Sequence, residues 1–319
     1  PVGSLQTSDY NLQSDNGALY NLTHLTNARG HTSVTWSDAL GRTYRVVSPA
    51  GPGVTYSYDA ADRLVQAQYG PYTTSLSYDF AGRKLSMNDP DMGAWSYAYD
   101  ALGNLVEQTD ARGCVTSLSY DGLNRLLGKS YSNASAGNCA AIAANTAAVS
   151  YSYDQGTNGI GRRSGMSDAS GSTLWEYDLR GRLTAETVAI GGVGTYTTLW
   201  SYNSADWVVG MTYPNGERLS THYNLQGLAT EVESGNWNRY VSQAEYDEAG
   251  RLLEWKLGNG VETSRTYYPW DTQGGRLQST VSAVSQTPTI IWQHLGYTYD
   301  ANGNLSVVQD NVASETLNY

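Results

Sequence analysis

The chain has 319 residues and a formal net charge of −11, so it lacks the surplus of lysine and arginine that phosphate binding needs, and nucleic acid is excluded as the expected partner. No apolar run is long enough to cross a membrane, so no membrane span is expected. Only 15% of the residues are charged, and the 34 glycines, 26 tyrosines and single phenylalanine favour a water-exposed sheet over a dry globular core.

The chain begins with a degenerate stretch, residues 1–35, whose one recognisable turn is Asn27 to Gly30. From Trp36 onward an aromatic residue recurs, mostly every 20 to 25 residues (58 to 78 is 20; 177 to 202 is 25). Recurrence at a nearly fixed period indicates a repeat protein. The predicted aromatic ladder consists of Tyr58, Tyr78, Tyr99, Tyr120, Tyr153, Tyr177, Tyr202, Tyr223, Tyr246, Tyr268 and Tyr299.

A turn-forming residue follows most ladder positions, commonly in the order Tyr-Asp-x-x-Gly-Arg. The Asp side chain accepts hydrogen bonds from backbone N–H groups further along the turn, and Gly tolerates a left-handed backbone. The pattern predicts a type I turn closed by a residue with positive φ, which is a common hairpin connection. The predicted turn residues are Asp59, Asp79, Gly82, Asp100, Gly103, Asp121, Asp178, Gly181, Asp247, Gly250, Asp300 and Gly303. The arginines that follow the turns, at 42, 63, 83, 125, 182 and 251, are expected to pair with a neighbouring Asp or to stack on Tyr.

Large and small side chains alternate before each turn, as in Val54, Tyr56, Ser57 and Tyr58, and this period of two predicts a β-strand. A second turn, such as Asp110 to Gly113, closes each unit, so one repeat is a pair of strands. A lone hairpin is marginal in water, and each repeat must therefore pair with the next. The expected fold is all-β: one continuous array of β-hairpins over residues 1–319.

Two steps of the series are longer (120 to 153 is 33; 268 to 299 is 31) and predict insertions near 132–147 and 278–290. The first insertion is rich in alanine and is expected to form a helical turn or an exposed loop. The second is expected to form a polar loop or an extended hairpin. Cys114 and Cys139 flank one repeat and part of the first insertion, and a disulfide between them would indicate an oxidising compartment. Two free thiols are the alternative.

No catalytic, cofactor-binding or metal-binding constellation is recognisable. Aspartates recur at turn after turn, whereas a catalytic pair is needed once, and the four histidines have no metal-ligand spacing. The chain is therefore expected to be no enzyme and to need no cofactor. Trp237 and Trp270 fall in turn regions, and they are the candidate glycan contacts because exposed indoles stack on sugar rings.

The Tyr-Asp-x-x-Gly-Arg-Leu turns at 177–183 and 246–252, with Asn27 to Gly30 and Asp110 to Gly113, resemble the bacterial Rhs/YD-repeat family over nearly the whole chain. The resemblance implies a β-sheet that spirals into a hollow tube or shell. In that family such shells enclose a C-terminal toxin, and related walls occur in toxin-complex proteins and teneurins. Toxin-enclosing members have a self-cleaving core after the repeats, with an Asp-Pro-x-Gly type motif. This sequence lacks it, since Asp89-Pro90 lies in an ordinary repeat turn.

The expected function is that of a non-enzymatic wall in a secreted or cell-surface bacterial protein. The start at Pro1 and the stop at Tyr319 within a repeat are expected to be cuts in a longer protein. The missing core favours an open tube or filament, whose partners are further repeats of the same chain or identical subunits. A closed cocoon around a toxin and a carbohydrate-binding adhesin are the alternatives.

Overall fold

The computed structural model describes residues 5–7, 12–15, 17–27, 30–49, 51–133, 139, 146–235, 238–284 and 290–318. These residues fold almost entirely into antiparallel β-strands, so the all-β prediction is confirmed. No helix in this part of the chain is long and apolar enough to span a membrane.

The strands are β1 (Leu5–Thr7), β2 (Leu12–Asp15), β3 (Ala18–Thr26), β4 (Thr32–Ser37), β5 (Thr43–Val47), β6 (Val54–Tyr58), β7 (Leu64–Tyr69), β8 (Tyr72–Tyr78), β9 (Lys84–Asp89), β10 (Gly93–Tyr99), β11 (Leu105–Thr109), β12 (Cys114–Tyr120), β13 (Leu126–Asn133), β14 (Val149–Tyr153), β15 (Arg163–Asp168), β16 (Gly171–Tyr177), β17 (Leu183–Ile190), β18 (Gly194–Tyr202), β19 (Val208–Thr212), β20 (Arg218–Tyr223), β21 (Ala229–Ser234), β22 (Arg239–Tyr246), β23 (Leu252–Leu257), β24 (Val261–Tyr267), β25 (Leu277–Val284), β26 (Ile290–Tyr299), β27 (Leu305–Asp310) and β28 (Glu315–Asn318). One short helix, α2 (Trp270–Gln273), follows β24.

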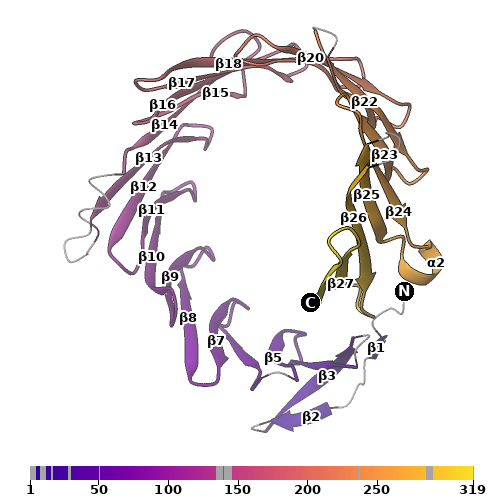
Figure 1. Cartoon of the computed structure of the whole chain (residues 1–319). Helices are drawn as coiled ribbons and strands as arrows, with labels where there is room; N and C mark the ends of the chain where they lie inside the picture. The colour runs from indigo at the N-terminus through magenta and orange to yellow at the C-terminus, as the bar shows by residue number, and fades with distance from the viewer. Residues whose placement is uncertain are drawn as a thin grey trace. The chain divides into compact units, whose positions relative to one another are not determined.

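The chain divides into two compact units, an N-terminal unit (Gly3–Tyr153 with Gly165–Ser172) and a C-terminal unit (Asp154–Ser164 with Thr173–Tyr319). In the N-terminal unit each strand from β3 to β14 pairs antiparallel with the next strand in the sequence (Figure 1). In the C-terminal unit the strands from β17 to β28 pair in the same way. Each unit is thus a hairpin array. Continuity of one array over the whole chain stays a prediction.

The hairpin turns have the geometry that the Tyr-Asp-x-x-Gly-Arg pattern indicates. In the turn after β8, the N–H of Asp79 donates to the carbonyl of Arg83 (2.9 Å), and the N–H of Gly82 donates to the carbonyl of Asp79 (3.1 Å). Gly82 has φ 82°, and the strand register shifts between Ser77 and Tyr78. This is a type I turn closed by a bulge residue of positive φ. Three turns place another residue in this position, namely Asp62 (φ 61°), Asn124 (φ 62°) and Asp206 (φ 66°).

The two faces of the sheets differ in chemistry because successive side chains alternate between them. The tyrosine face holds the ladder tyrosines and the large residues two positions before them. The opposite face, the hydroxyl face, presents small hydroxyl side chains that form hydrogen bonds across strands. These pairs are Ser77–Ser86, Ser150–Ser167, Thr187–Thr197, Thr266–Ser279 and Thr298–Ser306.

Neither unit contains a conventional hydrophobic core. Among the described residues, the buried hydrophobic side chains are Leu22, Val115, Cys139, Ala185, Ala244 and Val261. The chain exposes 19642 Å² of surface, whereas a compact protein of this length exposes about 13,000 Å². Backbone pairing and side-chain contacts between neighbouring hairpins, rather than deep burial, therefore stabilise the array.

The two predicted insertions have different outcomes. Residues 134–138 and 140–145 lie outside the described residues. The prediction of a helical turn or an exposed loop at 132–147 is therefore not tested. Cys139 is described, and it forms the predicted disulfide with Cys114 (Cα–Cα 4.9 Å). In the second insertion β25 and β26 form an extended antiparallel pair as far as Val284 and Ile290, and residues 285–289 between them lie outside the described residues.

Candidate functional site

Six repeat turns are each closed by their own aspartate and arginine, namely those that begin at Asp38, Asp59, Asp79, Asp121, Asp178 and Asp247. In the turn after β8, Asp79 Oδ1 accepts the backbone N–H of Arg83 (2.9 Å), and Asp79 Oδ2 accepts Arg83 Nε (2.6 Å). The carboxylate is only 18% exposed. These donors, the backbone N–H of Arg83 foremost, hold the pKa of Asp79 below its ordinary value of 3.8 against the opposing effect of desolvation. The turn aspartate is thus fixed in its charged form.

The same arginine also reaches the following repeat. Arg83 Nη1 donates to the carbonyl of Asp100 (2.9 Å), and its guanidinium carbon lies 5.0 Å from the centre of the Tyr99 ring. Tyr99 Oη donates in the opposite direction, to the carbonyl of Lys84 (3.0 Å). We call this set, the turn aspartate and arginine of one repeat with the tyrosine of the next, the clasp.

The clasp recurs in both units. Arginine lies over the tyrosine of the next repeat in Arg42–Tyr58, Arg63–Tyr78, Arg83–Tyr99, Arg125–Tyr153, Arg162–Tyr177, Arg182–Tyr202, Arg251–Tyr267 and Arg276–Tyr299. A hydroxyl donated to the backbone of the preceding repeat occurs at Tyr58, Tyr99, Tyr120, Tyr153, Tyr177, Tyr202, Tyr223, Tyr246, Tyr267 and Tyr299. Burial raises the pKa of Tyr120 and Tyr202, so these hydroxyls remain donors at neutral pH. The clasp is therefore a repeated fastening along one edge of each hairpin array.

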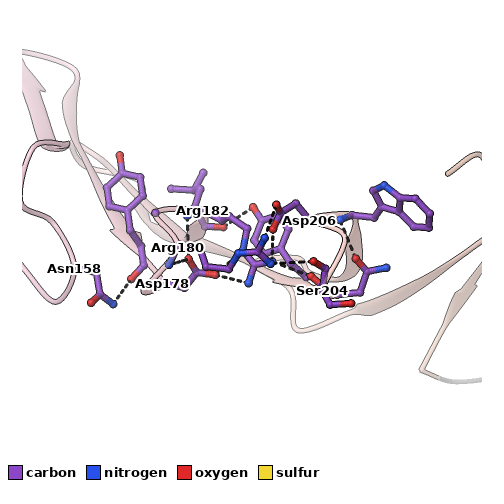
Figure 2. A network of polar contacts seen from close by, with 12 residues as sticks. Asn158, Asp178, Arg180, Arg182, Ser204 and Asp206 are labelled. Atoms are coloured by element: carbon purple, nitrogen blue, oxygen red, sulfur yellow. Dashed lines mark hydrogen bonds and ion pairs between the residues drawn. The ribbon is translucent and has the colours of Figure 1, made fainter.

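Figure 2 shows a clasp network of the C-terminal unit that involves two arginines. Arg182 binds Asp178 within its own turn (Nε–Oδ2 2.7 Å) and, in the next turn, the carbonyl of Asn203 (2.9 Å) and Asp206 Oδ1 (2.8 Å). Arg180 binds the other carboxylate oxygen of Asp206 (2.9 Å). One turn thus holds the next with two guanidinium groups.

The Arg182 network predicts an effect on stability. Replacing Arg182 by alanine leaves Asp178 and Asp206 without that cation and uncovers the Tyr202 ring. We expect the urea midpoint of the C-terminal unit to fall by roughly 0.5 M. Lysine keeps the charge but not the planar set of donors, so Arg182→Lys should recover only part of this loss. Equal midpoints for wild type and Arg182→Ala, measured by circular dichroism, would show that the clasp is not stabilising.

The ladder prediction is wrong at Tyr268, and Trp36, where the aromatic series is expected to begin, does not occupy a ladder position. In the turn before β25, Tyr267 pairs with Leu277, and its hydroxyl donates to the carbonyl of Leu252 (2.8 Å). Tyr268 instead takes the backbone place of the turn aspartate, with its N–H donating to Arg276, because helix α2 replaces the ordinary turn here. Ser37, rather than Trp36, has the corresponding place before Asp38, because it pairs with Thr43 across the turn.

The candidate glycan contacts have different outcomes. Trp270 begins helix α2 and is 59% exposed, but the guanidinium carbon of Arg251 lies 4.7 Å from its ring centre. One partner of this indole is therefore an arginine of the same chain. Trp237 lies outside the described residues. Glycan binding by either residue stays a prediction.

The clasps are suited to attachment rather than to catalysis. Within the described ranges, no group of three or more His, Cys, Asp or Glu side chains could hold a metal ion. The turn carboxylates are used by the arginines and backbone N–H groups of the turns. The repeated arrangement joins neighbouring hairpins.

The clasp carboxylates also predict how stability depends on pH. Hydrogen bonds, first those from the backbone, lower the pKa of Asp59, Asp79, Asp121 and Asp247 from 3.8. A lowered pKa in the folded state means that the unfolded state binds more protons, so the stabilisation is present above pH 3.8 and is lost as the pH falls through the folded value. We expect Asp79→Asn to be less stable than wild type at pH 7, and the difference to shrink below about pH 4. Urea titrations at pH 7, 5, 4 and 3 measure it; a difference that does not change with pH would contradict it.

Comparisons with known proteins give consistent similarities. A family model described as RHS Repeat matches residues 99–136. The chain is 28% identical over 162 residues to a protein of Dickeya dadantii (strain 3937) named "Probable deoxyribonuclease RhsA", covering 46% of the chain and 11% of that protein. It is also 28% identical over 145 residues to "Probable deoxyribonuclease RhsB" of the same organism, covering 42% and 10%.

The fold is similar to that of two solved structures. The crystal structure of TcdB2–TccC3 without its hypervariable C-terminal region matches with a TM-score of 0.76 and 17% identity, over 97% of the chain and 18% of the solved one. The Photorhabdus luminescens Tc holotoxin pore matches with a TM-score of 0.74 and 17% identity, over 92% and 17%. The chain thus spans about a tenth of the length of these curated relatives and less than a fifth of these solved chains.

Proposed function

The chain is an array of RHS repeats of the Rhs/YD type, and on this premise we propose that it is a segment of the wall of a hollow shell that encloses a polypeptide. The observation that carries the proposal is the single-layer construction of each unit. Most side chains on both faces are half-buried or exposed, and the contacts between elements among the described residues of each unit are those between paired strands. A sheet that covers no core of its own is suited to being a wall.

The clasp explains how such a wall is held together. Strand pairing joins each hairpin to the next through the backbone, and the clasp adds a side-chain fastening at the turn edge. Each contact involves only neighbouring repeats, so stability sums along the array, and repeats can be added without changing those already present. A wall of any length can therefore be built from one local design.

Enclosure of a polypeptide is favoured over an open filament by the similar proteins. The two curated relatives are named as probable deoxyribonucleases, and one solved neighbour is a Tc holotoxin pore. The chain covers only about a tenth of these relatives, so the lack of a self-cleaving core within this sequence no longer favours the open tube. We therefore put the cocoon first and keep the filament as the alternative.

We also propose that the parent protein is exported by a bacterium. The Cys114–Cys139 disulfide supports this, because disulfides persist in oxidising compartments. The similar Tc holotoxin pore supports it as well.

A protease-protection experiment tests the enclosure. The intact parent protein is treated with proteinase K, and the polypeptide that follows the repeats is followed by immunoblot. We expect that segment to survive in the intact particle and to be digested when the same segment is expressed alone or when the particle is first unfolded in urea. Digestion at equal rates in the intact particle and in the isolated segment would overturn the proposal.

A further inference from the structure

A cavity lies on the tyrosine face of the N-terminal unit, at the edge opposite the clasps. It has a volume of about 420 Å³ and lies between the turn joining β7 to β8 and the turn joining β9 to β10. Its walls include Tyr69, Tyr72, Asp89 and Asp91. The two tyrosines are 46% and 60% exposed, so both rings are accessible from solvent.

The cavity has two of the three groups of a clasp. Tyrosine rings and carboxylates line it, but no arginine or lysine does. Neither Tyr69 nor Tyr72 has an arginine or lysine over its ring among the contacts of the described residues. The corresponding tyrosines at the clasp edge, such as Tyr78 and Tyr99, are covered by arginines of the preceding repeat.

The two carboxylates of the cavity are held differently. Asp89 accepts the hydroxyl of Thr74 (2.6 Å) and the backbone N–H groups of Asp91 and Met92 (3.0 Å each). These bonds, that of Thr74 foremost, lower the pKa of Asp89, so it is charged at neutral pH. The side chain of Asp91 is exposed and has no hydrogen-bond or ion-pair partner among the described residues. The cavity therefore presents negative charge and one uncommitted carboxylate beside aromatic rings.

A similar arrangement recurs in the C-terminal unit. A cavity of about 510 Å³ is lined by Tyr196, Tyr213, Asn215 and Glu217, again at the turn edge opposite the clasps and again without arginine or lysine. Glu217 Oε1 accepts the hydroxyl of Tyr240. Both cavities adjoin a turn that contains proline, Pro90 in one and Pro214 in the other. Tyrosine rings beside a carboxylate, without arginine or lysine, thus occur in two separate places, although the Glu217 carboxylate already has a partner.

We propose that the cavity at Tyr69, Tyr72 and Asp91 binds the guanidinium group of an arginine in a partner polypeptide. The arginine would complete the set of groups found in the clasp, with a carboxylate for its charge and an aromatic ring for its planar face. The chain has a net charge of −11, which complements a basic segment. Arginine is favoured over lysine because the chain itself places guanidinium groups against its tyrosines, and Lys84 over Tyr97 is the exception among the described pairs.

The test is fluorescence anisotropy with a fluorescein-labelled peptide of alternating glycine and arginine, titrated with the complete chain at low salt. Two matched peptides replace each arginine by citrulline, which is neutral and nearly isosteric, or by lysine. We expect the citrulline peptide to bind at least about tenfold more weakly and the lysine peptide to be intermediate.

Two protein variants distinguish binding at this cavity from non-specific attraction of the peptide to an acidic chain. Tyr72→Leu/Asp91→Asn should weaken binding of the arginine peptide by about tenfold at unchanged thermal stability, since both side chains are exposed. Glu315→Gln removes an exposed carboxylate from β28 and should change the affinity by less than about twofold. Equal binding of the citrulline peptide, tighter binding of the lysine peptide, or an equal loss in Glu315→Gln would each overturn the proposal. None of these results bears on the wall, which rests on the single-layer construction of each unit.

Discussion

Replacing Gly53 by alanine is expected to destabilise the N-terminal unit by about 3 kcal/mol. Gly53 has φ +84°, and a Cβ atom added there would lie 2.8 Å from the carbonyl oxygen of Val46 and 3.1 Å from a methyl group of Val47. The left-handed backbone costs an L-residue roughly 1–2 kcal/mol, and the clash is with backbone of the neighbouring strand, which cannot move aside without breaking its pairing.

Gly41 provides a matched control for that prediction. It has nearly the same backbone angle (φ +80°), but no atom lies within 4 Å of an added Cβ. Gly41→Ala should therefore cost only the backbone term, about 1 kcal/mol. Urea unfolding of both variants and wild type, followed by circular dichroism, measures the difference. If Gly41→Ala and Gly53→Ala lose the same stability, the close approach at Gly53 does not exist in solution.

Removing the disulfide is expected to have a comparable effect. The bond closes a loop with a sequence separation of 25 residues between β12 and the first insertion, and Cys139 is 1% exposed. Loop-closure entropy gives about 3 kcal/mol for a loop of this length. Cys114→Ser/Cys139→Ser should lower the free energy of unfolding of the N-terminal unit by up to that amount.

Reduction supplies the internal control for the disulfide. Dithiothreitol should shift the urea midpoint of the wild type towards that of the double variant and should leave the variant unchanged. A wild type that unfolds at the same urea concentration with and without dithiothreitol would contradict the expectation. Retained stability in the variant would mean that β12 and its neighbours suffice to hold this part of the unit.

The local structure of the repeats could be predicted because it depends on a few residues close together in the sequence. Asp at one position and Gly three residues later specify a type I turn with a left-handed closing residue, and Asp62, Asn124 and Asp206 fill the same position with the residue types that tolerate it. The alternation of large and small side chains in the strand before the turn specifies which face of the sheet the tyrosines occupy. These are short-range rules, and one repeat contains all of them.

The ladder prediction failed at Tyr268 for a local reason. Tyr267 and Tyr268 are adjacent, and either could be the ladder tyrosine by sequence. The sequence pattern does not reveal that helix α2 replaces the ordinary turn, which places Tyr267 in the ladder. The sequence also suggested arginine–aspartate pairs and stacking on tyrosine, but it did not show that a single arginine such as Arg83 makes both contacts. This double role became visible only from the structure, which shows how the turn of one hairpin lies against the tyrosine of the next.

The outer cavities could not be predicted because their residues come from different hairpins. Tyr69 and Tyr72 flank one turn, whereas Asp89 and Asp91 belong to the next turn on the same edge. Nothing in either segment alone distinguishes these residues from ordinary exposed turn residues. Only the pairing of β8 with β9, which brings Thr74 to Asp89, places the two turns beside each other.

Electron microscopy of the intact native protein that contains this chain tests the wall most directly. We expect a closed shell whose wall is one β-sheet thick, with density for a polypeptide inside it. Open-ended fibres of uniform width would contradict the enclosure and favour the filament. A compact particle in which another domain covers both faces of these sheets would contradict the wall itself.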